Sequence, residues 1–420
     1  MITSILPGVT VEVVAGERDA GSSVEGVVTT FLELDWGDTL TILRQGADTL
    51  APLGYKLSDA KMKLVNEAMN YANQLLLYRI NGGEKAAGEL ATGLTVTAKY
   101  PGTRGNDITV AVEESGGNWA IRTFLDALEL DVQTVSAPEQ FRANDFISLD
   151  GSGALETKTV KLSGGTDGAA GDVSSYLAEI AKHDYNILFY TGTDAETIAS
   201  IKGFIKEQRT NGVMVQAVVS GDAANDKAIY NSTVGGATQN YELTAAEACS
   251  TMAGILAKQG VKGSATYYDV IGWTDVNPRL TKAQQETKTQ NGEILFVSLY
   301  GGVKVLYDSN SLTTYSADNP EDFHKGLVVR TLDKYASDLQ LLLNTRAIGK
   351  IRNTVQGRNQ IKGFIVDMTN KDYLDPGYVE GFTADDVDVA EGGTRDSVTV
   401  TVGIRVADTV DKIYVKVIAQ

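Results

Sequence analysis

The chain has 420 residues and a formal net charge of −17, with 43% hydrophobic and 22% charged residues. This length allows about two or three domains with separate cores, and the composition is that of a globular protein rather than a disordered one. The negative charge argues against a protein that wraps nucleic acid or lies on an anionic membrane, and no apolar run approaches the roughly 18 residues of a membrane span.

The first part of the chain predicts a β-α-β unit. An apolar strand is expected over 26–34, an amphipathic helix over 58–73 and a second apolar strand over 75–80, which ends at Asn81-Gly82-Gly83. A helix between two such strands favours a mostly parallel sheet.

The pattern then changes to short alternating strands separated by Gly, Asn and Asp. Strands are expected over 94–98, 108–112 and 157–162. The stretch 163–171 is rich in glycine and small polar residues, which predicts a flexible joint. Because the α/β pattern resumes after this joint, we expect a β-domain inserted into an α/β core.

The resumed pattern alternates helices with apolar strands and ends in a long helix. The helices are expected over 172–182, 194–208, 245–259 and 322–343, and the strands over 186–190, 213–219, 293–299 and 303–306. The last helix carries an apolar stripe through Val328, Leu332 and Tyr335, so we expect it to pack on a core.

Both ends of the chain have the alternation of strands with no evident local partner. Near the start, Val9, Val11 and Val13 alternate with polar residues. Near the end, the same pattern covers 398–406 and then the last apolar run, in which Ile413, Val415 and Val417 alternate with other residues. Unpaired strand edges recruit other chains, which favours pairing between molecules, but strands that close the protein's own sheet would give the same pattern.

One stretch has a charge opposite to that of the whole chain. Between Asp338 and Asp367 every charged residue is basic. These residues are Arg346, Lys350, Arg352, Arg358 and Lys362. They form a candidate docking patch, and the alternative is a solvated face with acidic partners elsewhere in the sequence.

The sequence shows little that would support catalysis, a metal or a cofactor. His183 and His324 lie in unrelated segments, and no zinc, phosphate-loop, nucleophile-elbow or dinucleotide motif is present. Asp385, Asp386 and Asp388 lack the spacing of a calcium loop, and Cys249 lies in an apolar helical pattern that predicts a buried residue. We therefore expect no catalytic residue, no metal and no cofactor.

Two other classes of protein stay open. One is an α/β enzyme or carbohydrate-binding protein with an accessory β-domain, in which Trp36, Trp119 or Trp273 would stack on sugars. The other is a structural protein of a virus particle, such as a tube or capsid protein.

Six segments, each present once, follow one another along the chain. They are Leu6–Val13 (LPGVTVEV), Leu77–Gly83 (LYRINGG), Tyr100–Asp107 (YPGTRGND), Ser163–Gly168 (SGGTDG), Lys350–Asp367 and Asp411–Val417 (DKIYVKV). In this order the set resembles the tail sheath proteins of contractile-tailed bacteriophages and of the related phage-tail-like bacteriocins. The resemblance spans nearly the whole chain.

The resemblance implies a structural function. Sheath subunits stack as hexameric rings around a tail tube, exchange terminal strands with neighbouring copies, and contract to drive the tube through a cell envelope. It therefore implies partners in other copies of the chain, the tube protein, the baseplate and the tail terminator, with no bound nucleic acid and no membrane insertion. The protein would be made in the cytoplasm of a host bacterium and reside in the virion tail. The basic stretch would face the tube.

Pattern and resemblance together predict an α/β (α+β) core with an inserted β-rich domain and extended terminal β-strand arms. The expected divisions are an N-terminal arm at 1–24, a core at 25–90 plus 166–390, an inserted outer β-domain at 91–165, and C-terminal strands and arm at 391–420.

Overall fold

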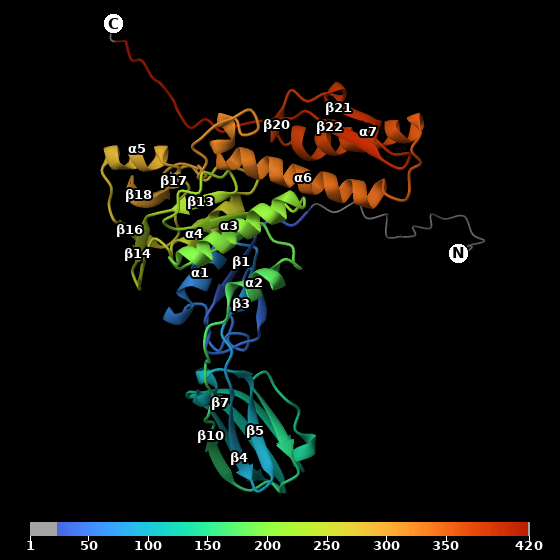
Figure 1. The fold of residues 1–420 in the computed structure, drawn as a ribbon. Helices are drawn as coiled ribbons and strands as arrows, with labels where there is room; N and C mark the ends of the chain where they lie inside the picture. The colour runs from blue at the N-terminus through green and yellow to red at the C-terminus, as the bar shows by residue number, and fades with distance from the viewer. Residues whose placement is uncertain (1–22, 419–420) are drawn as a thin grey trace, which may run out of the picture. The chain divides into compact units, whose positions relative to one another are not determined.

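The computed structural model describes residues 23–418, so Val9, Val11 and Val13 lie outside the described residues. Contacts along the chain group these residues into two compact units. The first, called the body, comprises 24–333 and 408–418; the second, called the C-terminal unit, comprises Ser23 and 334–407. Both mix helices with strands, which confirms the predicted α+β class (Figure 1).

The body is built on a seven-stranded sheet in the order β17-β13-β12-β11-β1-β3-β2. All its pairings are parallel except that of β2 with β3 at one edge. The strands are β1 Val27–Leu32, β2 Leu40–Arg44, β3 Gln74–Arg79, β11 Ile187–Phe189, β12 Gln216–Val219, β13 Ile229–Ser232 and β17 Glu293–Ile294. The parallel sheet predicted from the β-α-β pattern is confirmed.

Helices cover both faces of this sheet, because its central strands carry apolar side chains on both sides. Val28 and Leu75 pack in one core with helices α1 Lys63–Met69 and α4 Cys249–Gln259. The alternate residues Val27 and Leu76 pack in a separate core with helices α2 Val173–Ile180 and α3 Ala195–Thr210. The result is a three-layer α/β/α arrangement.

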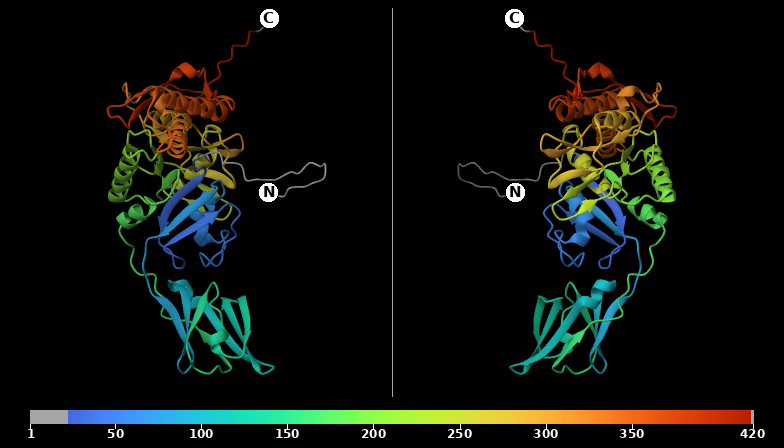
Figure 2. Two further views of the ribbon diagram at one scale, coloured as in Figure 1. Left: turned by 90° about the vertical axis from the view of Figure 1, so that its right-hand side faces the viewer. Right: turned by 90° about the vertical axis from the view of Figure 1, so that its left-hand side faces the viewer.

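A β-domain interrupts the body after β3. It consists of two facing sheets, ordered β10-β6-β7-β8 and β4-β5-β9 (Figure 2). Its strands are β4 Lys85–Ala91, β5 Leu94–Pro101, β6 Ile108–Ser115, β7 Asn118–Leu125, β8 Leu128–Val135, β9 Ile147–Gly151 and β10 Lys158–Lys161. Apolar residues from both sheets, such as Val96 and Val110, share one core.

The prediction of a flexible joint at 163–171 is wrong. This segment runs antiparallel to 81–87 through the bridges Asn81↔Ala170, Glu84↔Thr166 and Ala87↔Ser163. At Gly83, with φ +121°, a Cβ atom would lie 2.0 Å from the Thr166 carbonyl oxygen. Glycine is used here for close backbone approach rather than for freedom of motion.

Arg79 connects this joint to the body and to the β-domain. The buried guanidinium donates hydrogen bonds to the carbonyls of Asn81 (3.0 Å), Gly37 (3.0 Å) and Pro101 (2.8 Å). Trp36, from the segment after β1, is buried in the core of the β-domain and lies edge-on to Tyr100. The β-domain is therefore held by side chains as well as by its two connections.

The remainder of the body is a small β-rich region next to the sheet. It contains β14 Gly235–Thr238, β15 Glu242–Leu243, β16 Trp273–Asn277, α5 Lys282–Gln290, β18 Phe296–Leu299 and β19 Gly302–Val305. The single strand expected over 293–299 is divided at Leu295: β17 joins the central sheet, whereas β18 pairs with β19.

Cys249 is fully buried at the start of α4, as predicted, and burial raises the pKa of its thiol. The thiolate is the reactive form, so we expect no modification of the folded protein by Ellman's reagent and modification of one thiol per chain in denaturant. Absorbance at the wavelength of the released thiolate measures both. Rapid labelling of the folded chain would show that this helix opens readily.

The C-terminal unit begins within the long helix α6 Gly326–Arg346, which starts in the body (Figure 1). It continues with α7 Val355–Thr369, the π-turn η5 Asn370–Leu374, and the strands β20 Val379–Glu380, β21 Val387–Glu391, β22 Val398–Val402 and β23 Arg405–Val406. The expectation that 398–406 has no local partner is wrong. The run breaks at Gly403, β22 pairs with β21, and β23 pairs with β20.

Candidate functional site

The β21–β22 sheet presents one apolar face and one polar face. The strands are antiparallel, with Val387 opposite Val402 and Val389 opposite Val400. These valines and Val398 pack in one core with Ile361 and Ile365 of α7. The alternate side chains Asp388, Thr399 and Thr401 are exposed.

Both outer edges of this two-stranded sheet are open. Among residues 23–418, β21 and β22 pair only with each other. A two-stranded sheet is marginal by itself, and its free backbone groups can accept further strands. The sheet is therefore a candidate acceptor for β-strand addition.

The last described segment of the chain is a candidate donor strand for such a sheet. Residues 412–418 form no helix or strand, although their alternation predicts one. The side chains of Ile413, Val415 and Val417 are 76%, 78% and 87% exposed. Exposed apolar residues in a row mark an interaction segment.

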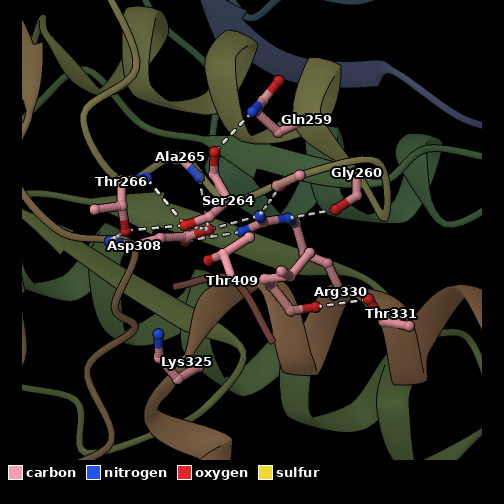
Figure 3. A network of polar contacts seen from close by, with 12 residues as sticks. Gln259, Gly260, Ser264, Ala265, Thr266, Asp308, Lys325, Arg330, Thr331 and Thr409 are labelled. Carbon is pink, nitrogen blue, oxygen red and sulfur yellow. Dashed lines mark hydrogen bonds and ion pairs between the residues drawn. The ribbon is translucent and has the colours of Figure 1, made fainter. Parts of the chain in front are cut away.

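Lys325 holds the root of this segment against the body. Its ammonium lies 3.0 Å from Asp408, contacts Asp411, and lies over the ring of Tyr307 (Figure 3 shows Lys325 near Thr409). Burial alone lowers the pKa of Lys325, but the hydrogen bonds to Asp411 and Asp408 raise it above its ordinary value. The amine therefore stays charged, and the chain is fixed up to Asp411.

A buried ion pair fixes the start of α6. Arg330 donates to both carboxylate oxygens of Asp308, at 2.9 and 2.7 Å, and both side chains are almost fully buried (Figure 3). Arg330 also donates to the carbonyls of Gly260 (2.9 Å) and Gly263 (3.2 Å). Burial by itself raises the pKa of Asp308, but Arg330 lowers it below its ordinary value, so the pair is ionised.

The Asp308 carboxylate also organises the backbone around it. It accepts a hydrogen bond from the Ala265 N–H (2.8 Å), and the Asp308 carbonyl accepts one from the Gly326 N–H (2.9 Å). A Cβ atom on Gly326 would lie 2.0 Å from the carboxylate, so the close approach requires glycine.

The N-terminal end of the described chain is also held by a carboxylate on α6. Asp338 accepts hydrogen bonds from the Ser23 backbone N–H, the Tyr373 hydroxyl and the Lys334 ammonium, each at 2.7 Å. The first described residue is therefore fixed to α6 by this carboxylate.

The predicted basic residues have different environments. Lys350 and Arg352 are exposed in the connection between α6 and α7. Arg346, at the end of α6, lies over the ring of Phe364. Two exposed apolar side chains that the sequence did not indicate lie close by in the chain, Ile348 in this connection (69%) and Val355 at the start of α7 (60%).

The two remaining basic residues lie on α7 and are half-buried. Arg358 donates to Asn353 and lies 3.9 Å from Glu391, and Lys362 is one turn further along. The exposed part of the predicted patch is therefore the α6–α7 connection, where basic and apolar side chains occur together.

The part of the chain that the structure describes offers little support for sugar binding, metal binding or a membrane span. Trp36 and Trp273 are buried, and Trp273 donates to Glu67, so neither offers a face for stacking on a sugar. Trp119 is half-buried against the core of the β-domain. Over residues 23–418, no cluster of His, Cys, Asp and Glu is placed to hold a metal ion. Within the same residues, no helix combines the length and hydropathy that a membrane span requires.

Family models of phage tail sheath proteins match consecutive parts of the chain. Residues 25–80 match the tail sheath protein Gp18 domain III N-terminal region, 81–167 the phage tail sheath protein beta-sandwich domain, 168–311 the central domain and 318–420 the C-terminal domain. The β-domain described above thus coincides with the beta-sandwich model.

Individual proteins agree with these matches. The chain is 33% identical to the sheath tail protein of Desulfitobacterium hafniense, with a TM-score of 0.84 over 98% of this chain and 99% of that one. It is 27% identical to the phage-like element PBSX protein XkdK of Bacillus subtilis, over 94% and 93% of the two chains. It also shares the fold of the contracted helical sheath of the anti-feeding prophage, with a TM-score of 0.57, 14% identity and full coverage of both chains. The resemblance noted from the sequence motifs is thereby confirmed, and the chain belongs to the phage tail sheath protein family.

Proposed function

We propose that this chain is the subunit of a contractile sheath that polymerises as stacked hexameric rings around a tail tube and contracts to drive the tube through a target cell envelope. The observation that carries the proposal is that one chain has both a possible donor strand and a possible acceptor sheet. Each copy has an exposed apolar segment at 413–418 and a two-stranded sheet with open edges. Such a contact between identical chains is heterologous, so it extends from copy to copy.

The side-chain pattern of the donor fits the acceptor. In a strand added beside β21 or β22, Ile413, Val415 and Val417 would continue the apolar face that packs on α7. Tyr414 and Lys416 would then lie on the polar face. Burying an aliphatic side chain contributes about 1.5–3 kcal/mol, and the added backbone hydrogen bonds would fix the register.

The N-terminal residues Val9, Val11 and Val13 have the same alternation, and we propose that they supply a second added strand. In this arrangement 1–24 and the part of 391–420 that follows β23 act as arms, the α/β core moves, and the β-domain lies on the outside. Strands contributed by neighbouring copies would keep the subunits connected while the cores move. No nucleotide or metal is needed, because the energy is stored in the extended assembly.

The proposal assigns the particle and the partners as well. The subunit would be made in the cytoplasm of a host bacterium and assemble into the tail of a virion or phage-like particle. Its partners would be other copies of itself, the tube protein, the baseplate and the tail terminator. The family model and the solved structure that the chain matches are those of sheath proteins, and we propose that this chain is likewise a structural protein and not an enzyme.

Negative-stain microscopy of the purified protein tests the polymerisation directly. We expect hollow cylinders of uniform width, because sheath subunits assemble through their arms. Shells would indicate a capsid protein instead, and dispersed particles at high protein concentration would contradict the proposal.

We further propose that the basic α6–α7 connection faces the tube. Replacing Lys350 and Arg352 by Glu is expected to leave the subunit folded and to give tubes without sheath, because both side chains are exposed and their contacts are electrostatic. Arg346 is left unchanged because it packs on Phe364. Electron microscopy of particles with co-expressed tube protein measures the effect.

The matched control reverses two exposed lysines of the β-domain, Lys85→Glu and Lys161→Glu. It changes the net charge by the same amount as the Lys350→Glu, Arg352→Glu variant and should leave the sheath on the tube. Normal sheath on the tubes of the Lys350→Glu, Arg352→Glu variant would show that this connection does not face the tube.

A further inference from the structure

The contacts around Lys325 do more than fasten the end of the chain. Asp408 and Asp411 converge on one ammonium. Thr409 joins the two carboxylates: its N–H donates to Asp408 (2.8 Å) and its hydroxyl donates to Asp411 (3.0 Å). Residues 408–411 form no regular turn, but these side-chain contacts hold them against Lys325. We call this arrangement the clasp.

The clasp sets the length of the tether that precedes the donor strand. While the clasp is closed, only Lys412 lies between the fixed residue Asp411 and Ile413. If it opens, the next fixed point toward the N-terminus is Ala407, whose N–H donates to the Tyr378 carbonyl (3.0 Å) beside the β20–β23 pairing. Residues 408–411 then become free chain, so the tether before Ile413 grows from one residue to five and gains about 13 Å of contour length.

The interactions that close the clasp are of a kind that can be broken. The Asp408 side chain is 40% exposed, so its ion pair with Lys325 is weak because water solvates both charges when they separate. The Asp411 side chain is 9% exposed, so its contact with Lys325 is the stronger part of the clasp. The neighbouring Arg330–Asp308 pair is fully buried and stays in place. The body can therefore release residues 408–411 without losing the start of α6.

We infer that the clasp of Lys325 with Asp408 and Asp411 is a releasable stop in the C-terminal arm, closed in the free subunit and in the extended sheath and open in the contracted one. The inference rests on the proposed function. When a ring of subunits widens, its circumference grows and adjacent bodies move apart. An arm that stays inserted in its neighbour must lengthen, and the clasp holds the length in reserve.

Zero-length cross-linking with a water-soluble carbodiimide tests the inference, because this reagent joins a lysine amine to a carboxylate that contacts it. Mass spectrometry would quantify the Lys325–Asp411 and Lys325–Asp408 cross-links in free subunits, in extended sheaths on their tubes and in contracted sheaths. The Lys288–Glu293 pair (2.7 Å) of the body provides an internal reference. We expect equal relative yields in the first two samples and at least a fivefold lower yield in the third.

A neutralised variant provides the functional readout. Asp408→Asn with Asp411→Asn opens the clasp but leaves Ile413–Ile418 intact, so its sheaths should assemble and then contract without a trigger several-fold faster than unaltered sheaths. The matched control, Asp375→Asn with Asp385→Asn, removes the same charge from exposed positions of the C-terminal unit and should behave as the unaltered chain. Equal cross-link yields in extended and contracted sheaths would overturn the inference alone. A protein that forms no sheath would overturn the proposed function and the inference together.

Discussion

Deletion of residues 413–420 is expected to abolish polymerisation while leaving the thermal unfolding of the subunit unchanged. The deleted side chains described by the structure are exposed, so their removal exposes no core. The clasp at Lys325 also stays intact, because Asp408 and Asp411 precede the deletion. Sedimentation velocity measures assembly, and calorimetry measures the transition.

Two substituted variants test whether assembly depends on the apolar side chains of this segment or only on the presence of the segment. Ile413→Asp with Val415→Asp places charges on the row that would face α7 of another copy and should prevent assembly. Tyr414→Asp with Lys416→Asp alters the alternate positions and should reduce assembly much less. If the deleted chain melts well below the full-length chain, the segment stabilises its own subunit and the strand-exchange account is wrong.

The second large effect is expected at the buried ion pair. Asp308→Asn leaves the Arg330 guanidinium buried without a counter-charge, which typically costs about 3–5 kcal/mol. Because folded proteins are stable by about 5–15 kcal/mol, this is a large fraction of the total. The variant should therefore unfold at a clearly lower urea concentration, followed by circular dichroism.

An exposed pair is the natural control for this substitution. Arg279 and Asp275 are paired at 2.8 Å on the surface, and Arg279→Ala should cost no more than about 1 kcal/mol. The double variant Asp308→Asn, Arg330→Gln should cost less than the sum of its single variants, because the two side chains interact directly. Additive costs would show that the pair is not coupled as the geometry implies.

Much of the fold follows from local patterns in the sequence. The strands β1 and β3 are continuous apolar runs because both faces of the central sheet are covered, and the stripe through Val328, Leu332 and Tyr335 predicts α6. The inserted β-domain follows from its short alternating strands. These features depend on residues close together in the chain, so their spacing is visible without a structure.

The predictions that were wrong concern features that depend on pairing between distant segments. The apolar run at 293–299 gives no sign of its division at Leu295, which is decided by two different partner strands. The glycines of 163–171 suggest flexibility because their bridges to 81–87 are not visible locally. A composition that is flexible alone becomes ordered when a second segment supplies its hydrogen bonds.

The candidate assembly surfaces were predicted in part. Alternation at Ile413, Val415 and Val417 predicted a strand segment, and the structure shows that this segment is exposed. Its anchor was not predictable, because Lys325 and Asp411 are 86 positions apart and neither has an unusual local sequence. The β21–β22 acceptor was likewise missed, since its open edges become visible only when the pairing of every described strand is known.

Electron cryomicroscopy of the assembled sheath tests the central claim most directly. The account predicts that Ile413–Ile418 of each copy lies as an added strand beside the β21–β22 sheet of a different copy, with Ile413, Val415 and Val417 facing α7 of that copy. A map in which the segment folds back onto its own subunit, leaving the edges of β21 and β22 open, would contradict it.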